Sequence, residues 1–220
     1  MVNLLVIITS LRLLFLHGSG NSGNGFRNHL QKSFVSKLEE NAHECIFLDG
    51  PHIKNPNSDL NGLCWWTMKD GERSYNAKEL IGLEESINKI ESIENIDILV
   101  GHSQGSMISS IILARNPTRY KGAILSGAAY PTPAASILEN AKGKFPSNFH
   151  SIHAIGDADD MNPPALARKL TGIFKTEQNE ESTNENLIIY SHPGGHIFPI
   201  DDDAITLYER LINKVILNKT

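Results

Sequence analysis

The fold is decided by residues 96–115, which read IDILVGHSQGSMISSIILAR. The apolar run 96–100 is typical of a buried strand, and helical spacing follows from Ser106 to Arg115. Between them stands Gly-His-Ser-Gln-Gly, a G-x-S-x-G sequence whose glycines leave room for neighbouring backbone at a tight turn. This context predicts that Ser103 is a nucleophile at the end of a strand. A glycine-bounded turn with an incidental serine is the alternative.

Outward from this stretch, short apolar runs alternate with helical patterns along the chain. The spacing predicts further strands at 13–16, 45–48, 122–125, 151–155 and 187–190, and helices at 26–41, 77–93, 164–174 and 204–216. Such alternation is typical of an α/β protein with a mostly parallel central sheet and helices on both faces. Ligands of such sheets bind beyond the carboxyl ends of the strands.

Three stretches do not fit this alternation. Residues 51–76 and 131–148 lack sustained periodicity, and long segments of that kind in compact domains are usually functional, so we expect them to form a cap or the walls of a pocket. Trp65 and Trp66 would offer apolar area for a substrate there, with core packing as an equal alternative. Residues 178–186 are polar and acidic, which predicts a solvated loop.

A second glycine-containing turn follows the first strand, where residues 14–20 read LFLHGSG. A serine nucleophile that attacks an acyl group needs two backbone N–H donors for the oxyanion, one after the nucleophile and one from the loop after an earlier strand. We therefore predict that the N–H groups of Ser19 and Gln104 form the oxyanion hole. His17 is expected to brace the loop rather than to act as the base.

An acidic turn, GDADD at 156–160, follows the strand predicted at 151–155. A carboxylate at this place would orient an imidazole and stabilise its charged form. Asp157, Asp159 and Asp160 compete for the role, and the others are then ordinary turn residues. Cation binding by the group has little support, because no ligand-spaced partners follow.

The loop after the last predicted strand contains two histidines, in HPGGH at 192–196. His196 is better placed to be the base, and His192 is expected to brace the strand end. The order Ser, Asp, His along the chain, each at the carboxyl end of a predicted strand, is the order of the α/β-hydrolase triad.

With these motifs, the chain resembles the FSH-type family of serine hydrolases from about Leu13 to its last helix. The resemblance rests on the motifs already described, on LDGPH at 48–52, on the tryptophan pair, and above all on HPGGH-x-x-P at 192–199. It implies an α/β-hydrolase fold and a cofactor-free esterase or thioesterase, without a bound metal, that acts on small-molecule acyl esters or thioesters.

Residue by residue, the resemblance makes Ser103 the nucleophile, His196 the base and the aspartate of a Gly-x-x-Asp pattern the acid. Counted from Gly156, that acid is Asp159. The chain departs from the family at His102, where an aromatic residue is usual, and at Ser106, where alanine is usual; both bear on substrate preference rather than on the triad. Residues 1–11 have no clear family counterpart.

Composition sets limits on the other classes of function. A chain of 220 residues with 40% hydrophobic content suits one domain over residues 1–220. The net charge of −5 argues against nucleic acid as a partner. Cys45 and Cys64 are expected to be free thiols in a reducing, cytoplasmic setting, with a single bridge between them as the alternative.

The apolar residues at the amino terminus resemble neither a signal peptide nor a membrane span. No basic residue precedes them, Arg12 interrupts them, and no small-residue cleavage site follows, so secretion is not expected. They are also shorter than the ~20 residues of a spanning helix. Residues 2–8 are open to two interpretations, an added edge strand or a tail.

Two other functions compete with a general esterase. A lactonase or an acyl-protein thioesterase would carry the same motifs and differ only in substrate. A non-catalytic hydrolase-fold binding protein is the alternative from another class, and the complete Ser, Asp and His set argues against it.

Overall fold

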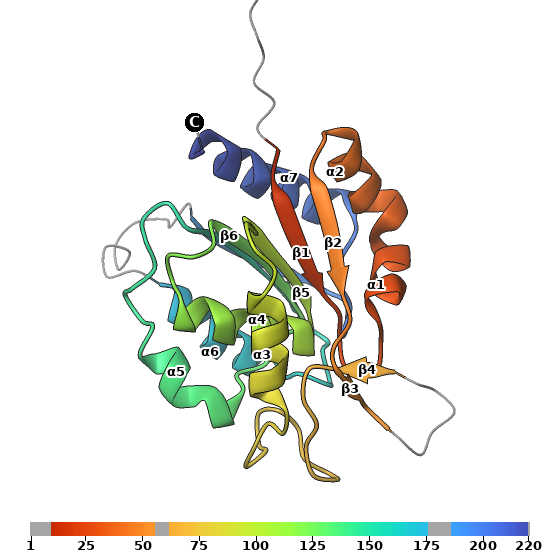
Figure 1. Cartoon of the computed structure of the whole chain (residues 1–220), viewed down its shortest axis with the longest axis vertical. Coiled ribbons are helices and arrows are strands. Elements are labelled where there is room, and N and C mark those ends of the chain that lie inside the picture. The colour runs from red at the N-terminus through yellow and green to blue at the C-terminus, as the bar shows by residue number, and fades with distance from the viewer. Residues whose placement is uncertain (1–9, 56–61, 176–185, 220) are drawn as a thin grey trace, which may run out of the picture.

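A six-stranded parallel sheet forms the centre of the computed structural model, which describes residues 10–55, 62–175 and 186–219 (Figure 1). Its strand order is β2-β1-β5-β6-β7-β8, and each neighbouring pair is parallel. The strands are β1 (Arg12–Leu16), β2 (Glu44–Leu48), β5 (Ile98–His102), β6 (Gly122–Ser126), β7 (His150–Gly156) and β8 (Leu187–His192). The predicted mostly parallel sheet is therefore confirmed.

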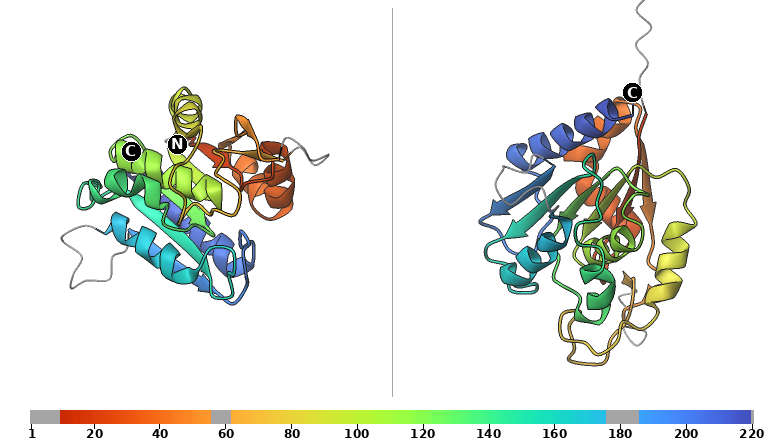
Figure 2. Two further views of the ribbon diagram at one scale, coloured as in Figure 1. Left: turned by 90° about the horizontal axis from the view of Figure 1, so that it is seen from below. Right: turned by 90° about the vertical axis from the view of Figure 1, so that its left-hand side faces the viewer.

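Helices cover both faces of this sheet, as the two further views in Figure 2 show. One face carries α1 (Gly23–Leu30), a π-helical turn (Gln31–Val35), α2 (Ser36–Glu40) and α7 (Asp202–Leu217). The other carries α3 (Leu83–Glu91), α4 (Gln104–Arg115), α5 (Ala135–Glu139) and α6 (Pro164–Thr171), with 3₁₀ turns at Thr132–Ala134 and Gly172–Phe174. The sheet thus separates two hydrophobic cores.

The central strands are apolar on both faces, which is why they read as continuous hydrophobic runs. On β1, Leu13 and Phe15 pack into the core of α1 and α7, whereas Leu14 and Leu16 pack into the core of α3 and α4. All four are inaccessible to solvent. Strands buried on both sides lose the apolar-polar alternation of a half-exposed sheet.

The strand order reverses between β1 and β5. The chain runs outward from β1 to β2, and later returns to place β5 on the other side of β1. At such a switch point the loops after the two strands diverge and leave a crevice at the carboxyl ends. The loops that begin at His17 and Ser103 are the ones that flank this crevice.

Several boundaries differ from the prediction. The helix predicted at 26–41 is divided by the π-helical turn, and the helix predicted at 77–93 begins only at Leu83, after Gly82 with its positive φ of 85°. A short hairpin, β3 (His52–Ile53) and β4 (Leu63–Cys64), was not predicted. The predictions for residues 2–8 and for most of 178–186 fall outside the described residues.

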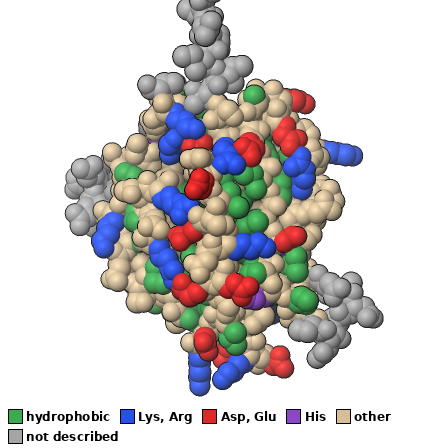
Figure 3. Space-filling model, viewed as in Figure 1, with side chains coloured by type: hydrophobic (Ala, Val, Ile, Leu, Met, Phe, Trp, Pro, Cys, Tyr) green, Lys and Arg blue, Asp and Glu red, His purple; other side chains and the backbone are tan. Residues whose placement is uncertain are grey.

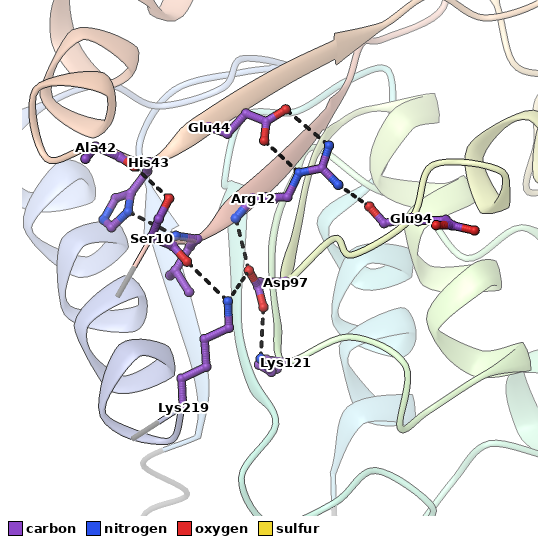
Figure 4. Close-up of polar contacts among 10 residues, drawn as sticks. Ser10, Arg12, Ala42, His43, Glu44, Glu94, Asp97, Lys121 and Lys219 are labelled. Carbon is purple, nitrogen blue, oxygen red and sulfur yellow. Dashed lines mark hydrogen bonds and ion pairs between the residues drawn. The ribbon is translucent and has the colours of Figure 1, made fainter. Parts of the chain in front are cut away.

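A charged cluster joins the amino ends of the strands, opposite the crevice (Figure 4). The buried carboxylate of Asp97 accepts hydrogen bonds from the Arg12 N–H at 3.0 Å and from the ammonium groups of Lys121 and Lys219, both at 2.9 Å. Burial opposes ionisation of Asp97, but these three donors hold its pKa below the usual value. Lys219 follows α7, so the cluster ties the end of the last helix to the first strand.

In the described part of the chain, no helix is long and apolar enough to cross a membrane. Cys45 and Cys64 are free, as expected.

Candidate active site

Ser103 lies on a strained turn between β5 and α4. Its φ of 54° and ψ of −117° are unusual for a residue with a side chain, and its N–H donates to the Ser126 carbonyl at 2.8 Å. A β-carbon on Gly105 would overlap the Leu16 carbonyl, and one on Gly101 would crowd the backbone at Gly105. The two glycines therefore allow the close approach of backbone that this turn requires.

Three side chains from separate loops form a continuous chain of hydrogen bonds. His196 Nε2 lies 2.8 Å from Ser103 Oγ, and His196 Nδ1 lies 2.8 Å from Asp159 Oδ2. The second oxygen of Asp159 accepts from the N–H groups of Met161 at 3.0 Å and Asn162 at 2.8 Å. With a carboxylate on one side of it, the imidazole carries its proton on Nδ1 and presents a free Nε2 to the hydroxyl, as an activated serine requires.

The other two aspartates and the second histidine are not part of this series of hydrogen bonds. Asp157 is exposed and faces the Arg168 guanidinium at 3.7 Å, and Asp160 is also exposed. His192 is buried at the end of β8, where its carbonyl accepts from the Asp157 N–H at 2.9 Å. Of the three aspartates, Asp159 alone contacts His196.

Close backbone packing explains Gly156, the last residue of β7. A β-carbon on Gly156 would overlap the Gly195 carbonyl, and the Ala158 N–H donates to the Gly194 carbonyl at 3.2 Å. The loops after β7 and β8 are thus held against each other. This contact sets the position of His196 relative to Asp159.

The loop after β1 lies directly against the nucleophile. A β-carbon on Gly18 would stand 3.2 Å from Ser103 Cβ, and Ser19 and Gln104 both line the pocket above the serine. No described residue accepts a hydrogen bond from the Ser19 N–H. Gln104 is the first residue of α4, where an N–H has no helical acceptor. Both predicted oxyanion donors are therefore near Ser103.

His17 braces this loop, as expected from the sequence. Its Nε2 accepts from the Gly50 N–H at 2.9 Å and its Nδ1 lies 2.8 Å from the Gly18 carbonyl. Burial lowers the pKa of the imidazole. His17 thus links the loop after β1 to the loop after β2.

A cavity of about 700 Å³ opens above Ser103 and His196. Its lining comes from four parts of the chain: residues 18–21; Lys54 with Met68 and residues 71–74; residues 102–104 with Met107; and the turn after Asp159. The prediction that 51–76 forms a pocket wall fits this lining for the residues that are described.

Two predictions about the pocket need correction. Trp65 and Trp66 do not line it; both are almost fully buried in the core, where their indole N–H groups donate to the His17 carbonyl and to Ser74 Oγ. Residues 131–148 do not line it either, because α5 packs into the core through Leu138. Partners for both indoles inside the protein make the core the better place for these large rings.

Several residues that line the pocket were not predicted from the sequence, above all Met161 and Asn162. They follow Asp159 directly, and Asn162 Nδ2 also donates to the Gly127 carbonyl at 2.7 Å. The available signal in the sequence was the position of these two residues, shortly after the predicted acid Asp159. Lys54, Met68 and Met107 carried no comparable signal, because they reach the pocket only through the fold.

His102 lies beneath the imidazole of His196. The two ring centroids are 5.1 Å apart, and His102 also contacts the rings of Phe26 and Phe198. Burial, followed by the neighbouring His196, lowers the pKa of His102 to about 3. His102 is therefore neutral at physiological pH and acts as an aromatic packing residue.

A parallel sheet with Ser103 after β5, Asp159 after β7 and His196 after β8 defines an α/β-hydrolase. More specifically, residues 7–207 match the model of the family described as Serine hydrolase (FSH1), so the chain belongs to that family. The resemblance predicted from the motifs is confirmed. The predicted enzyme class, a serine hydrolase of the carboxylesterase or thioesterase type, is confirmed at the level of the family.

Relatives and solved structures agree with this assignment. The chain is 28% identical over 210 residues to an esterase of Aedes aegypti, which covers 87% of this chain and 71% of the relative. It is 24% identical over 234 residues to the esterase OVCA2 of Danio rerio, covering 93% and 97%.

Solved structures share the fold at lower sequence identity. SOBER1 of Arabidopsis thaliana superposes with a TM-score of 0.66 at 20% identity, covering 94% of this chain and all of that one. Acyl-protein thioesterase 2 of Zea mays gives a TM-score of 0.66 at 14% identity, covering 94% of each chain.

Proposed function

We propose that the protein hydrolyses carboxylic esters or thioesters of acyl chains through an acyl-enzyme on Ser103. The observation that carries this proposal is the pair of 2.8 Å hydrogen bonds that join Asp159, His196 and Ser103. In the first step, His196 Nε2 takes the hydroxyl proton while Ser103 Oγ attacks the acyl carbonyl carbon. Asp159 stabilises the imidazolium and stays ionised.

The tetrahedral intermediate carries its negative charge on the former carbonyl oxygen. The N–H groups of Ser19 and Gln104 are the proposed donors to that oxygen, and one such donor contributes about 10²–10³ in rate. Collapse of the intermediate breaks the bond to the leaving alcohol or thiol, which receives the proton from His196.

A water molecule then releases the acid. It loses a proton to His196 and attacks the acyl carbon of the Ser103 ester, which gives a second tetrahedral intermediate. When this intermediate collapses, the bond between the acyl carbon and Ser103 Oγ breaks and His196 returns the proton to Oγ. The pocket supports an acyl substrate because Met68, Met107 and Met161 line it with adaptable apolar side chains. No step needs a cofactor.

Other proposals from the sequence stand beside this one. We propose in addition that the chain forms a single catalytic domain and that the protein is cytoplasmic. The free thiols of Cys45 and Cys64 support the cytoplasmic location. A lactonase or an acyl-protein thioesterase would use the same three residues. A chain-length series of p-nitrophenyl esters beside acyl thioesters distinguishes these substrates.

The direct test is Ser103→Ala. We expect kcat on an activated ester to fall by up to ~10⁶ and labelling by a fluorophosphonate probe to disappear. His196→Ala should have a comparable effect, whereas His192→Ala, its matched control in the same loop, should retain most activity. Turnover and labelling retained in Ser103→Ala would refute the proposed function.

A further inference from the structure

Two cationic side chains that the proposed mechanism does not use, Lys54 and Arg73, line the pocket above Ser103. Neither makes an ion pair or a side-chain hydrogen bond with any described residue. Other basic residues, such as Arg115 with Glu84, do have a carboxylate partner. Two cations without partners in one concave site call for an explanation.

Lys54 is held beside the loop of the proposed oxyanion hole. Its N–H donates to the Gly62 carbonyl at 2.8 Å, and the Gly20 N–H donates to the Leu63 carbonyl at 2.7 Å, so the β3–β4 hairpin is tied to the loop after β1. A β-carbon on Gly20 would stand 3.2 Å from Lys54 Nζ. The ammonium therefore lies over Gly20, next in sequence to Ser19.

Arg73 reaches the same pocket from another segment. Its N–H donates to Asn76 Oδ1 at 2.6 Å, and its carbonyl accepts from the Asn76 and Ala77 N–H groups. The next residue, Ser74, is buried and accepts from the Trp66 indole at 3.3 Å. The backbone that carries the guanidinium is thus anchored to the core, while the side chain is exposed.

The charge balance of the lining differs from that of the whole protein. Besides Lys54 and Arg73, the lining has one carboxylate, Glu72, which forms an ion pair with neither cation. The lining thus carries a formal charge of +1, whereas the chain carries −5. The face in Figure 3 mixes acidic and basic side chains. Cations along a concave wall attract anions and raise their local concentration.

We propose that Lys54 and Arg73 form an anion-binding subsite, so that the preferred substrates are esters or thioesters that also carry a carboxylate or phosphate. Arginine suits this role because its planar fork binds either group through two hydrogen bonds. The three pocket methionines contact the apolar part of the same substrate. This inference rests on the proposed function and narrows its substrate class.

The test compares anionic with neutral substrates in two arms. In the acyl arm, the p-nitrophenyl monoester of adipic acid is compared with its methyl diester. In the leaving-group arm, butyryl-CoA is compared with S-butyryl-N-acetylcysteamine. The measured quantity in each arm is the selectivity ratio, kcat/KM for the anionic substrate divided by kcat/KM for the neutral one.

We expect Lys54→Gln and Arg73→Gln each to lower the selectivity ratio about 5- to 10-fold in at least one arm. Glu72→Gln should raise it, and added salt should lower it in the wild type. Lys69→Gln is the matched control, because Lys69 belongs to the same segment but does not line the pocket. A response in the acyl arm places the anion on the acid, and one in the leaving-group arm places it on the alcohol or thiol side.

Failure of the subsite is distinguishable from failure of the proposed function. Selectivity ratios that stay within about twofold of wild type in both arms for both variants would overturn the subsite, provided that Ser103→Ala abolishes turnover. Turnover that survives Ser103→Ala would instead refute the proposed function, and the subsite with it.

Discussion

Among the described residues, one buried aspartate lies at each end of the parallel sheet. The two aspartates have different hydrogen-bond partners. Asp159 at the carboxyl ends and Asp97 at the amino ends are each 5% exposed. Asp159 accepts two backbone N–H groups and faces the imidazole of His196. Asp97 accepts one backbone N–H and faces two ammonium groups.

The difference shows how one type of buried group serves two purposes. Asp97 forms ion pairs with both lysines at 2.9 Å, so the cluster is a fixed link, here called the Asp97 lock, between the first strand and the end of the last helix. In the proposed mechanism, the partner of Asp159 gains and loses a proton in each cycle. A carboxylate whose hydrogen bonds come partly from neutral backbone groups can stabilise that transient charge without being permanently neutralised.

Of the changes that test this comparison, Asp159→Asn has the largest expected effect. The amide would favour the wrong imidazole tautomer at His196, so kcat should fall by about 10⁴ with little change in stability. Steady-state kinetics on a p-nitrophenyl ester would measure the loss. Asp157→Asn, a change of the same kind in the same turn, should leave kcat within a few-fold of wild type. A full loss at Asp157 alone would show that the acid has been assigned wrongly.

Asp97→Asn should have the opposite pattern. The variant keeps an acceptor for the Arg12 N–H but leaves two ammonium groups without their carboxylate, so we expect the free energy of unfolding to fall by about 1–3 kcal/mol. Urea denaturation followed by circular dichroism measures this, and kcat should stay near the wild-type value. A large loss of kcat with unchanged stability would contradict the view that Asp97 contributes to stability and Asp159 to catalysis.

The pH dependence of stability follows from the lowered pKa of Asp97. A carboxylate with a lower pKa in the folded than in the unfolded state stabilises the fold above its unfolded pKa of about 3.9, and this contribution is lost as pH falls through the folded pKa. The difference in unfolding free energy between wild type and Asp97→Asn should therefore be largest near neutral pH and shrink below about pH 4. A constant difference across this range would show that the charge of Asp97 is not the cause.

The sequence predicted the carboxyl end of the sheet much better than the amino end. Ser103 and His196 stand in local motifs, because strained turns and close backbone packing demand glycines at fixed spacings. The Asp97 lock has no such motif: its donors are 85, 24 and 122 residues away in the chain. Contacts between residues far apart in the chain leave no pattern in a single sequence.

The pocket was predicted only in part for a related reason. Trp65 and Trp66 were assigned to a substrate wall or to the core, and composition alone does not tell whether an indole N–H finds a partner inside the protein. Here both do, so both rings are buried. Met161 reaches the pocket because it follows Asp159, whereas Lys54 reaches it through a hairpin whose pairing the sequence did not reveal.

The smallest expected effect comes from His102→Phe. This variant also tests whether His102 takes part in proton transfer at the carboxyl end. Because burial keeps His102 neutral down to about pH 3, a phenyl ring should replace it with little loss of packing, and its Nε2 has no hydrogen-bond partner among the described residues to lose. We expect kcat/KM to stay within a few-fold of wild type, and its pH profile to be unchanged. A pH profile that changes in His102→Phe would show instead that His102 takes part in the proton transfer at the carboxyl end.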